Sequence, residues 1–148
     1  MNIFKKFKAN EARSVITGAP FVIGTDDNGN DAIIYIARAH HSNPEYKAEI
    51  DRLMQQHQSK LNNLSKDKDK AAHTKFIGEL VELAIKRTCI KAWSDNITDE
   101  NNLPLLYSEA SIEKLWADLP DLVDDIVSFA INSANYVGSF DEEESLKN

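Results

Sequence analysis

The sequence predicts an α+β protein that is mainly α-helical, with an N-terminal β-hairpin followed by a bundle of about four helices. Asn28-Gly29 lies between two apolar, β-branched runs, and this is a strong local signal for a hairpin because both residues tolerate positive φ. From Pro44 onward, apolar residues recur at three- and four-residue steps, as they do along one face of a helix. The length of 148 residues suits one domain, and an apolar content of 42% is sufficient for a core.

The hairpin is expected over residues 15–38, with one apolar run in 15–23 and the other in 31–38. The acidic loop between the runs does not match a calcium-binding loop. Its sixth position is Asp31 where glycine is needed, and its twelfth is Ala37 where glutamate is needed. Because an isolated hairpin is marginally stable in water, we expect it to pack on the helices or to gain a third strand.

The N-terminal arm, residues 1–12, places Ile3, Phe4 and Phe7 among lysines. One interpretation is a basic arm that folds Phe4 and Phe7 onto the body of the protein. The other is a docking arm for an acidic partner. We favour the first, because chain ends fray unless they are tied down.

Helices are expected over residues 44–64, 69–93, 108–117 and 119–136. The second carries two apolar stripes, which indicates a central helix that is buried on more than one side. Gly78 in its interior costs about 1 kcal/mol, so we expect another helix to approach closely there. The first stripe holds Ala72, Phe76, Leu80, Leu83, Ala84 and Arg87, and the second holds Ile77, Val81, Ile85 and Cys89.

The last two helices have recognisable starts. Ser108 and Asp118 are candidate N-caps, and Pro120 suits the first turn of the final helix. Acidic residues gather at that start, where the helix dipole favours them. A hydrolase that uses Asp121 and Asp125 as an acid–base pair is the least favoured function, because no nucleophile or cationic helper accompanies them. We therefore expect no catalysis.

The end of the chain follows Gly138, which suits the C-terminal end of a helix. Residues 1–138 are expected to form the domain, and residues 139–148 an acidic, mobile tail. The large aromatic residues Trp93 and Trp116 are expected to anchor the core.

The net charge of −7 argues against nucleic acid or an anionic membrane surface as the main ligand. A single cysteine, Cys89, excludes an internal disulfide and fits a reducing cytoplasm. We interpret Cys89 as a core residue, since no histidine lies near it in the sequence. There is no cofactor motif, no metal-ligand spacing and no apolar run long enough to span a membrane.

A series of short motifs from Trp93 to Tyr136 resembles the phage tail assembly chaperones of long-tailed phages and prophages. The series is a Trp-x-Asp element, a Leu-Pro-x-x-Tyr turn, a helix, Leu-Pro-Asp-Leu, and a helix ending in Asn-Tyr before an acidic tail. The residues that carry the resemblance are Trp93, Asp95, Pro104, Tyr107, Leu115, Leu119, Pro120, Asp121, Leu122, Ile126, Ala130, Asn135 and Tyr136.

The resemblance implies a chaperone that coats the apolar, helical tape measure protein in the host cytoplasm and is absent from the mature virion. It also implies a longer product, made by ribosomal frameshifting near the chain end, that recruits the tail tube protein. The alternatives are an acidic inhibitor that mimics nucleic acid, or another small helical protein–protein adaptor of prophage origin. A homo-oligomer is left open. The residues expected to bind the client are Ile77, Leu80, Val81, Ile85, Phe129 and Tyr136.

Overall fold

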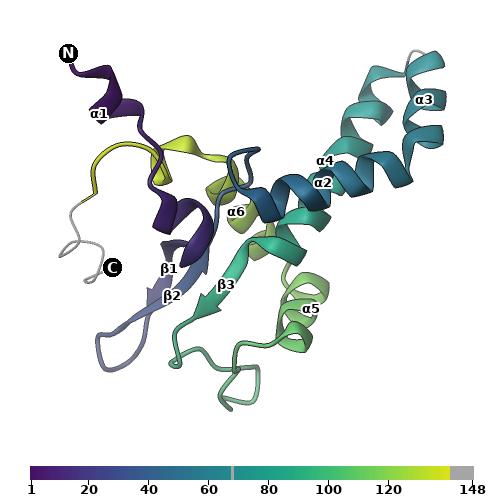
Figure 1. The fold of residues 1–148 in the computed structure, drawn as a ribbon. Coiled ribbons are helices and arrows are strands. Elements are labelled where there is room, and N and C mark those ends of the chain that lie inside the picture. The colour runs from purple at the N-terminus through teal and green to yellow at the C-terminus, as the bar shows by residue number, and fades with distance from the viewer. Residues whose placement is uncertain (68, 141–148) are drawn as a thin grey trace.

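The computed structural model describes residues 1–67 and 69–140, and its fold is the α+β, mainly helical one that the sequence predicts. Within these residues, three antiparallel strands form one sheet in the order β1-β2-β3. Figure 1 shows a helical arm, α2 to α4, that projects from one side of the sheet. The elements are α1 (Ile3–Phe7), the π-helix η1 (Ala12–Ile16), β1 (Ala19–Thr25), β2 (Asp31–Ile36), α2 (Pro44–Gln56), α3 (Gln58–Lys66), α4 (Lys70–Thr88), β3 (Ile90–Trp93), α5 (Glu109–Asp118), α6 (Pro120–Ile131) and the 3-10 helix η2 (Ser133–Asn135).

Strands β1 and β2 form the predicted hairpin. Gly29 has a φ of 81°, as the turn requires. The carboxylate of Asp26 accepts hydrogen bonds from the backbone N–H groups of Asn28 and Asn30, both at 2.9 Å. The Asn96 side chain, which follows β3, donates to the other carboxylate oxygen at 3.0 Å. This bond is the main reason that the pKa of Asp26 is lowered, and it ties the turn to the third strand.

The first strand begins at Ala19, later than predicted, because the residues before it form η1. Gly18 separates the two elements with a φ of 80°. A Cβ atom at this position would lie 2.7 Å from the backbone nitrogen of Ile36. Only glycine therefore permits this approach of the chain between η1 and β1 to β2 without a shift of the backbone.

The prediction of a helix over residues 69–93 is wrong at its C-terminal end. Helix α4 stops at Thr88, whose hydroxyl donates to the carbonyl oxygen of Ala84 at 2.8 Å. The residues after Cys89 form β3 instead, with Trp93 opposite Ile34 in β2. The open edge of β2 supplies hydrogen-bond partners that a continued helix cannot reach, and β-branched and aromatic residues suit a strand. The expected third strand is thus β3.

The predicted helix over residues 44–64 is two helices, α2 and α3, which are separated at His57. The backbone of His57 is not helical, with φ −106° and ψ 19°. Its ring meets the ring of Phe76 in α4 edge to face, with centroids 5.5 Å apart. The break sets a new direction for α3, and its Leu61 and Leu64 pack against the core.

Helix α4 lies beside α2 in the projecting arm (Figure 1). The predicted close helix contact at Gly78 is wrong. Gly78 is exposed, and a Cβ atom there would meet nothing within 4 Å. None of the helices in residues 1–67 and 69–140 combines the length and apolarity needed to cross a membrane.

The last helices, α5 and α6, pack against each other. The Ser108 hydroxyl caps α5 as predicted, accepting from the backbone N–H of Ser111 at 3.0 Å. Asp118 instead lies within α5, and Leu119 occupies the N-cap of α6 without a side-chain cap. The predicted helix over 119–136 ends at Ile131, because the backbone of Asn132 is extended. The Asn132 side chain accepts from the N–H of Ala134 and so caps the start of η2.

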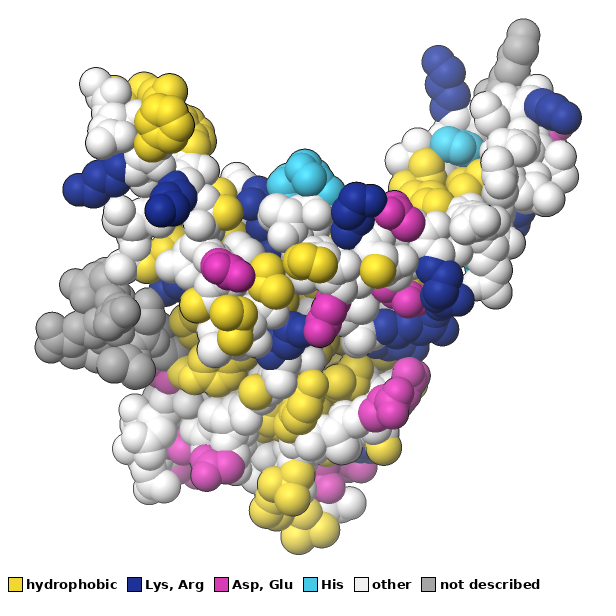
Figure 2. Space-filling model, in the orientation of Figure 1, with side chains coloured by type: hydrophobic (Ala, Val, Ile, Leu, Met, Phe, Trp, Pro, Cys, Tyr) yellow, Lys and Arg dark blue, Asp and Glu magenta, His cyan; other side chains and the backbone are white. Residues whose placement is uncertain are grey.

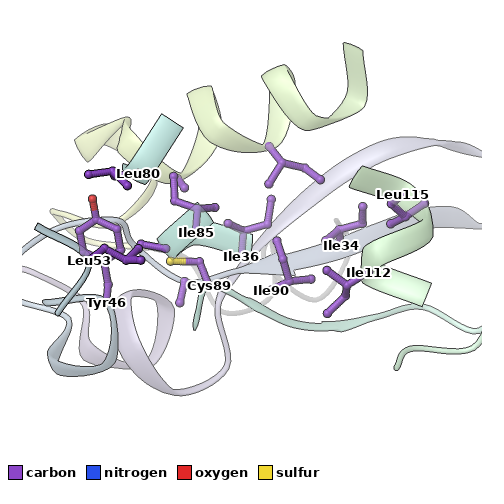
Figure 3. Close-up of a cluster of buried hydrophobic side chains, with 14 of the residues drawn as sticks. Ile34, Ile36, Tyr46, Leu53, Leu80, Ile85, Cys89, Ile90, Ile112 and Leu115 are labelled. Atoms are coloured by element: carbon purple, nitrogen blue, oxygen red, sulfur yellow. The ribbon is translucent and has the colours of Figure 1, made fainter. Parts of the chain in front are cut away.

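The core lies where the sheet, the base of the helical arm and α5–α6 meet. Figure 3 shows Ile36 of β2 beside Ile85 of α4 and Cys89, with Ile34 farther along the same strand. All four are essentially inaccessible to solvent, so Cys89 is the core residue that the sequence predicts. The predicted acidic tail lies outside the described residues beyond Phe140.

Candidate protein-binding surface

An apolar groove of about 390 Å³ lies between the sheet, the loop after β3, and helices α5 and α6. Ile34 and Trp93 are buried among its lining residues, whereas Leu119 is 45% exposed. The other apolar residues of the lining are Ile23, Ile97, Leu105, Leu115 and Leu122, and its polar residues are Thr98, Asp99, Glu100, Lys114 and Asp118. A groove with these walls suits apolar side chains, while its charged residues suit a polar surround.

Trp93 holds the loop that forms one wall of the groove. Its indole Nε1 donates to the carbonyl oxygen of Leu105 at 2.7 Å. Its ring meets the ring of Tyr107 edge to face, with centroids 5.2 Å apart, and the Tyr107 hydroxyl donates to the Ile90 carbonyl oxygen at 2.7 Å. These bonds attach both ends of the segment 105–107 to β3, so the groove is a built feature of the fold.

Lys114 links two sides of the groove. Its Nζ lies 3.1 Å from a carboxylate oxygen of Glu100 in the loop and 3.4 Å from one of Asp118 in α5. The pKa of Lys114 is raised, first because of the hydrogen bond to Glu100. Since these groups are exposed to solvent, the pairs orient the loop more than they stabilise the fold.

The structure places three of the expected client-binding residues in the core. Leu80 is 3% exposed, and Ile85 and Tyr136 are fully buried. Figure 3 shows Leu80 and Ile85 packed within the buried cluster. These side chains are therefore not available to a client in this structure. The remaining three, Ile77, Val81 and Phe129, are half-buried and do not line the groove.

Leu80 and Ile85 on α4 are covered by other parts of the chain. Helices α2 and α3 pack along α4, and β3 follows it directly. The groove instead uses the loop after β3. The sequence signal for this loop is the number of apolar residues in a short segment, among them Leu103, Leu106 and Tyr107. All three are exposed in the structure. Apolar side chains at the lower end of Figure 2 mark the tip of this loop.

The N-terminal arm also contradicts its prediction. Phe4 is 79% exposed and Phe7 is 62% exposed, so neither ring folds onto the body. With Ile3 they form an apolar surface on α1, which is visible as the hydrophobic group at the upper left of Figure 2. This makes α1 a second candidate for contact with another molecule.

The carboxylates considered for catalysis, Asp121 and Asp125, are both exposed on α6. Burial raises the pKa of the Cys89 thiol to about 11, the opposite of what a nucleophile needs. Across the described ranges, no group of three or more His, Cys, Asp or Glu residues is placed to hold a metal ion.

Comparison with known proteins gives one family. Residues 41–148 match the family described as YdaY prophage protein, so the match runs from the start of α2 to the end of the chain. It includes α4, β3, α5, α6 and most of the groove lining, and excludes α1 and the hairpin. No curated protein and no solved structure matches the chain. Because the match covers well over half of the sequence, the chain belongs to the YdaY prophage protein family.

Proposed function

We propose that this prophage protein is a tail assembly chaperone that binds the tape measure protein through the groove between β3, the following loop, α5 and α6. The observation that carries the proposal is the groove itself. Its walls are apolar, its volume is about 390 Å³, and charged side chains surround it. A space of this size admits the anchoring side chains of a client helix, while the polar face of that helix stays in water.

The residues that carry the resemblance to tail assembly chaperones support this choice of surface. Trp93, Leu115, Leu119 and Leu122 all belong to that set, and all four line the groove. They come from β3 and, beyond the loop that follows it, from α5 and the start of α6. A shared binding surface gives one physical reason for their spacing.

The mode of action that we propose is stoichiometric binding without catalysis or a metal ion. The client is an apolar helical segment that would otherwise aggregate before the tail tube forms around it. Binding in the host cytoplasm and release before the virion matures are part of the same proposal. The proposal also includes a longer frameshifted product that recruits the tail tube protein. A search of the gene's 3′ end for an overlapping reading frame tests this part.

The nucleic-acid-mimicking inhibitor has less support. Such a protein needs carboxylates in a continuous stripe, whereas Figure 2 shows Asp and Glu side chains scattered among basic and apolar ones on this face. Several carboxylates are also paired within the chain, including Glu49 with Arg87 at 2.9 Å and Glu113 with Lys86 at 3.0 Å.

The test is co-expression with the tape measure protein of the same prophage, followed by affinity capture and measurement of soluble client. The informative variant is Leu119→Glu, which places a charge in the apolar groove at a side chain that is 45% exposed. The matched control is Ile131→Glu. It makes the same kind of change at the other end of α6, at a side chain that is 58% exposed and outside the groove.

We expect Leu119→Glu to reduce retained client about tenfold or more, because an unpaired charge in an apolar site costs well over 1.4 kcal/mol. Ile131→Glu should retain the client as the wild type does. Both variants should melt close to the wild type, since both positions are solvent-accessible. Equal retention by all three proteins would show that the groove is not the client site. Absence of client binding by the wild type would reject the chaperone function.

A further inference from the structure

Helix α1 presents an apolar surface that the rest of the described chain leaves uncovered. Ile3, Phe4 and Phe7 are 53%, 79% and 62% exposed. Together with Lys8 they line a shallow depression of about 520 Å³. Two exposed phenylalanines on one short helix are unusual for a free surface, because aromatic side chains contribute strongly to interfaces once they are buried.

A specific tether holds α1 away from the body (Figure 1). The chain just after the helix pairs with the segment that follows η2. The backbone N–H of Asn10 donates to the Tyr136 carbonyl oxygen at 2.7 Å, and Ala9 forms an antiparallel bridge with Val137. The N–H of Gly138 donates to the Lys8 carbonyl oxygen at 2.8 Å. The base of the arm is therefore held by residues 136–138, the segment that contains the buried Tyr136.

Gly138 shows that this tether is close-fitting. Its φ is 97°, a conformation that side chains other than glycine rarely adopt. A Cβ atom there would lie 3.3 Å from the carbonyl oxygen of Lys6 in α1. The helix thus stands in a defined position relative to the chain end, with its apolar side chains directed to solvent.

The charge of residues 1–13, which are the arm and the first residues of η1, is opposite to that of the rest of the protein. Residues 1–13 contain four basic residues and one acidic residue, a net charge of +3. Because the whole chain carries −7, the remaining residues carry −10. The four basic residues are Lys5, Lys6, Lys8 and Arg13. Three of these residues, Lys5, Lys6 and Lys8, lie in α1 or at its C-cap beside the apolar side chains, on an otherwise acidic protein.

We infer that α1 is a docking element for an acidic segment of another protein, in which carboxylates alternate with large apolar side chains. The apolar side chains of the segment would cover Phe4 and Phe7, and its carboxylates would face Lys5, Lys6 and Lys8. This is charge complementarity of the kind that selects partners and speeds their association. The surface is separate from the groove, so one protein can hold a client and a second partner together.

An acidic protein segment fits this surface better than an anionic membrane does. A membrane offers the same two chemistries, negative charge and an apolar interior. However, α1 has only five residues, and the rest of the chain carries −10. An anionic bilayer would repel that larger charge over the range of the screening length, whereas a short peptide segment contacts the arm alone.

The experiment measures binding of a fluorescein-labelled peptide of Glu-Glu-Leu-Leu repeats to the full chain by fluorescence anisotropy. One comparison peptide has glutamine at every glutamate position, and another has alanine at every leucine position. We expect the first peptide to bind and both comparison peptides to bind about tenfold more weakly or worse. Raising the salt from about 0.01 M to about 0.15 M shortens the screening length from about 30 Å to about 8 Å, so binding should weaken.

The variants assign the binding to α1. Phe4→Ser with Phe7→Ser should raise the Kd of the acidic peptide about tenfold or more. Ile131→Ser is the matched control, because Ile131 is 58% exposed at the end of α6 and lines neither the groove nor the depression on α1. The control should bind as the wild type does. Equal loss in the two proteins, or no loss in either, would overturn the proposal.

Two further outcomes would assign α1 to a different occupant. Sedimentation of the wild type, but not of the double variant, with phosphatidylglycerol vesicles in the absence of peptide binding would show a membrane contact. A dimer that dissociates in the double variant would show that a second copy of the chain covers α1. Either result overturns the docking of an acidic segment of another protein. Neither affects the client-binding test at the groove, which depends on Leu119 rather than on α1.

Discussion

The hydroxyl of Tyr136 donates a hydrogen bond to the backbone carbonyl oxygen of Ile36 at 2.9 Å, across 100 positions of the sequence. The Ala37 carbonyl oxygen lies 3.3 Å from the same hydroxyl. The side chain is fully buried, and this burial raises the pKa of Tyr136 well above its ordinary value. Since the carbonyl oxygen of Tyr136 also accepts from Asn10, one residue joins the sheet, the N-terminal arm and the end of the described chain.

Removal of that hydroxyl should destabilise the fold. Tyr136→Phe leaves two buried carbonyl oxygens without their shared donor, and we expect the free energy of unfolding to fall by about 1–3 kcal/mol. Urea denaturation measures the change. Tyr35→Phe is the control, because Tyr35 is half-buried in β2 and should change stability by less than about 0.5 kcal/mol. A neutral Tyr136→Phe would show that the bond does not contribute.

Two glycines should respond to alanine in opposite directions. Gly18→Ala introduces a Cβ atom 2.7 Å from the Ile36 nitrogen at a φ of 80°, so it should destabilise the protein by more than about 1 kcal/mol. Gly78→Ala occupies open space in the middle of α4 and should stabilise the protein by about 0.5–1 kcal/mol. Thermal melting compares the two. A stabilised Gly18→Ala protein would refute the tight approach of Gly18 to β2.

Cys89 should make the protein less stable in alkaline solution. Burial raises the pKa of its thiol to about 11, whereas an unfolded cysteine titrates near 8.5. Below about pH 8.5 the thiol is neutral in both states, and this contribution to stability is complete. As the pH rises toward 11 only the unfolded thiol ionises, so about 2–3 kcal/mol is lost. Urea unfolding from pH 7 to pH 10.5 should show a smaller loss of unfolding free energy in Cys89→Ala than in the wild type. The variant keeps the buried Tyr46 and Tyr136, whose pKa values burial also raises, so the difference between the two proteins reports on Cys89.

Trp93 should act mainly as an anchor of the fold. Its side chain is 8% exposed and bonds to the Leu105 carbonyl oxygen, so Trp93→Ala should cost about 3–5 kcal/mol. Trp116→Ala should cost less, because that ring is half-buried and its Nε1 has no hydrogen-bond partner within the described residues. If Trp93→Ala melted like the wild type but lost client binding, its role would be contact with the client instead.

A chain ending at Gly138 should fold. The described contact that it loses is the stacking of Arg13 on the Phe140 ring, with the guanidinium carbon 3.7 Å from the ring centroid. Such contacts contribute about 0.5–1 kcal/mol at exposed sites, so the melting temperature should fall by about 1–4 °C. Calorimetry of the two lengths provides the measurement. A much larger fall would mean that residues 139–148 are part of the folded domain.

Local sequence by itself determined the hairpin turn, the fold class and most helix starts. The turn needs positive φ at Gly29, and Ser108 supplies a hydroxyl to free backbone N–H groups, so neither signal depends on distant residues. The apolar periodicity of α4 also identified side chains that the structure buries, including Phe76 and Ala84.

Only the tertiary structure decided which apolar surfaces stay open. The residues after Cys89 continue a helical pattern in sequence, but the free edge of β2 converts them into β3. That strand and the loop after it form walls of the groove, while α2 and α3 pack along α4. The exposure of Phe4 and Phe7 was likewise set by pairing of the arm with residues 136–138. Periodicity records that a side chain is apolar, whereas burial depends on partners that arrive from far along the chain.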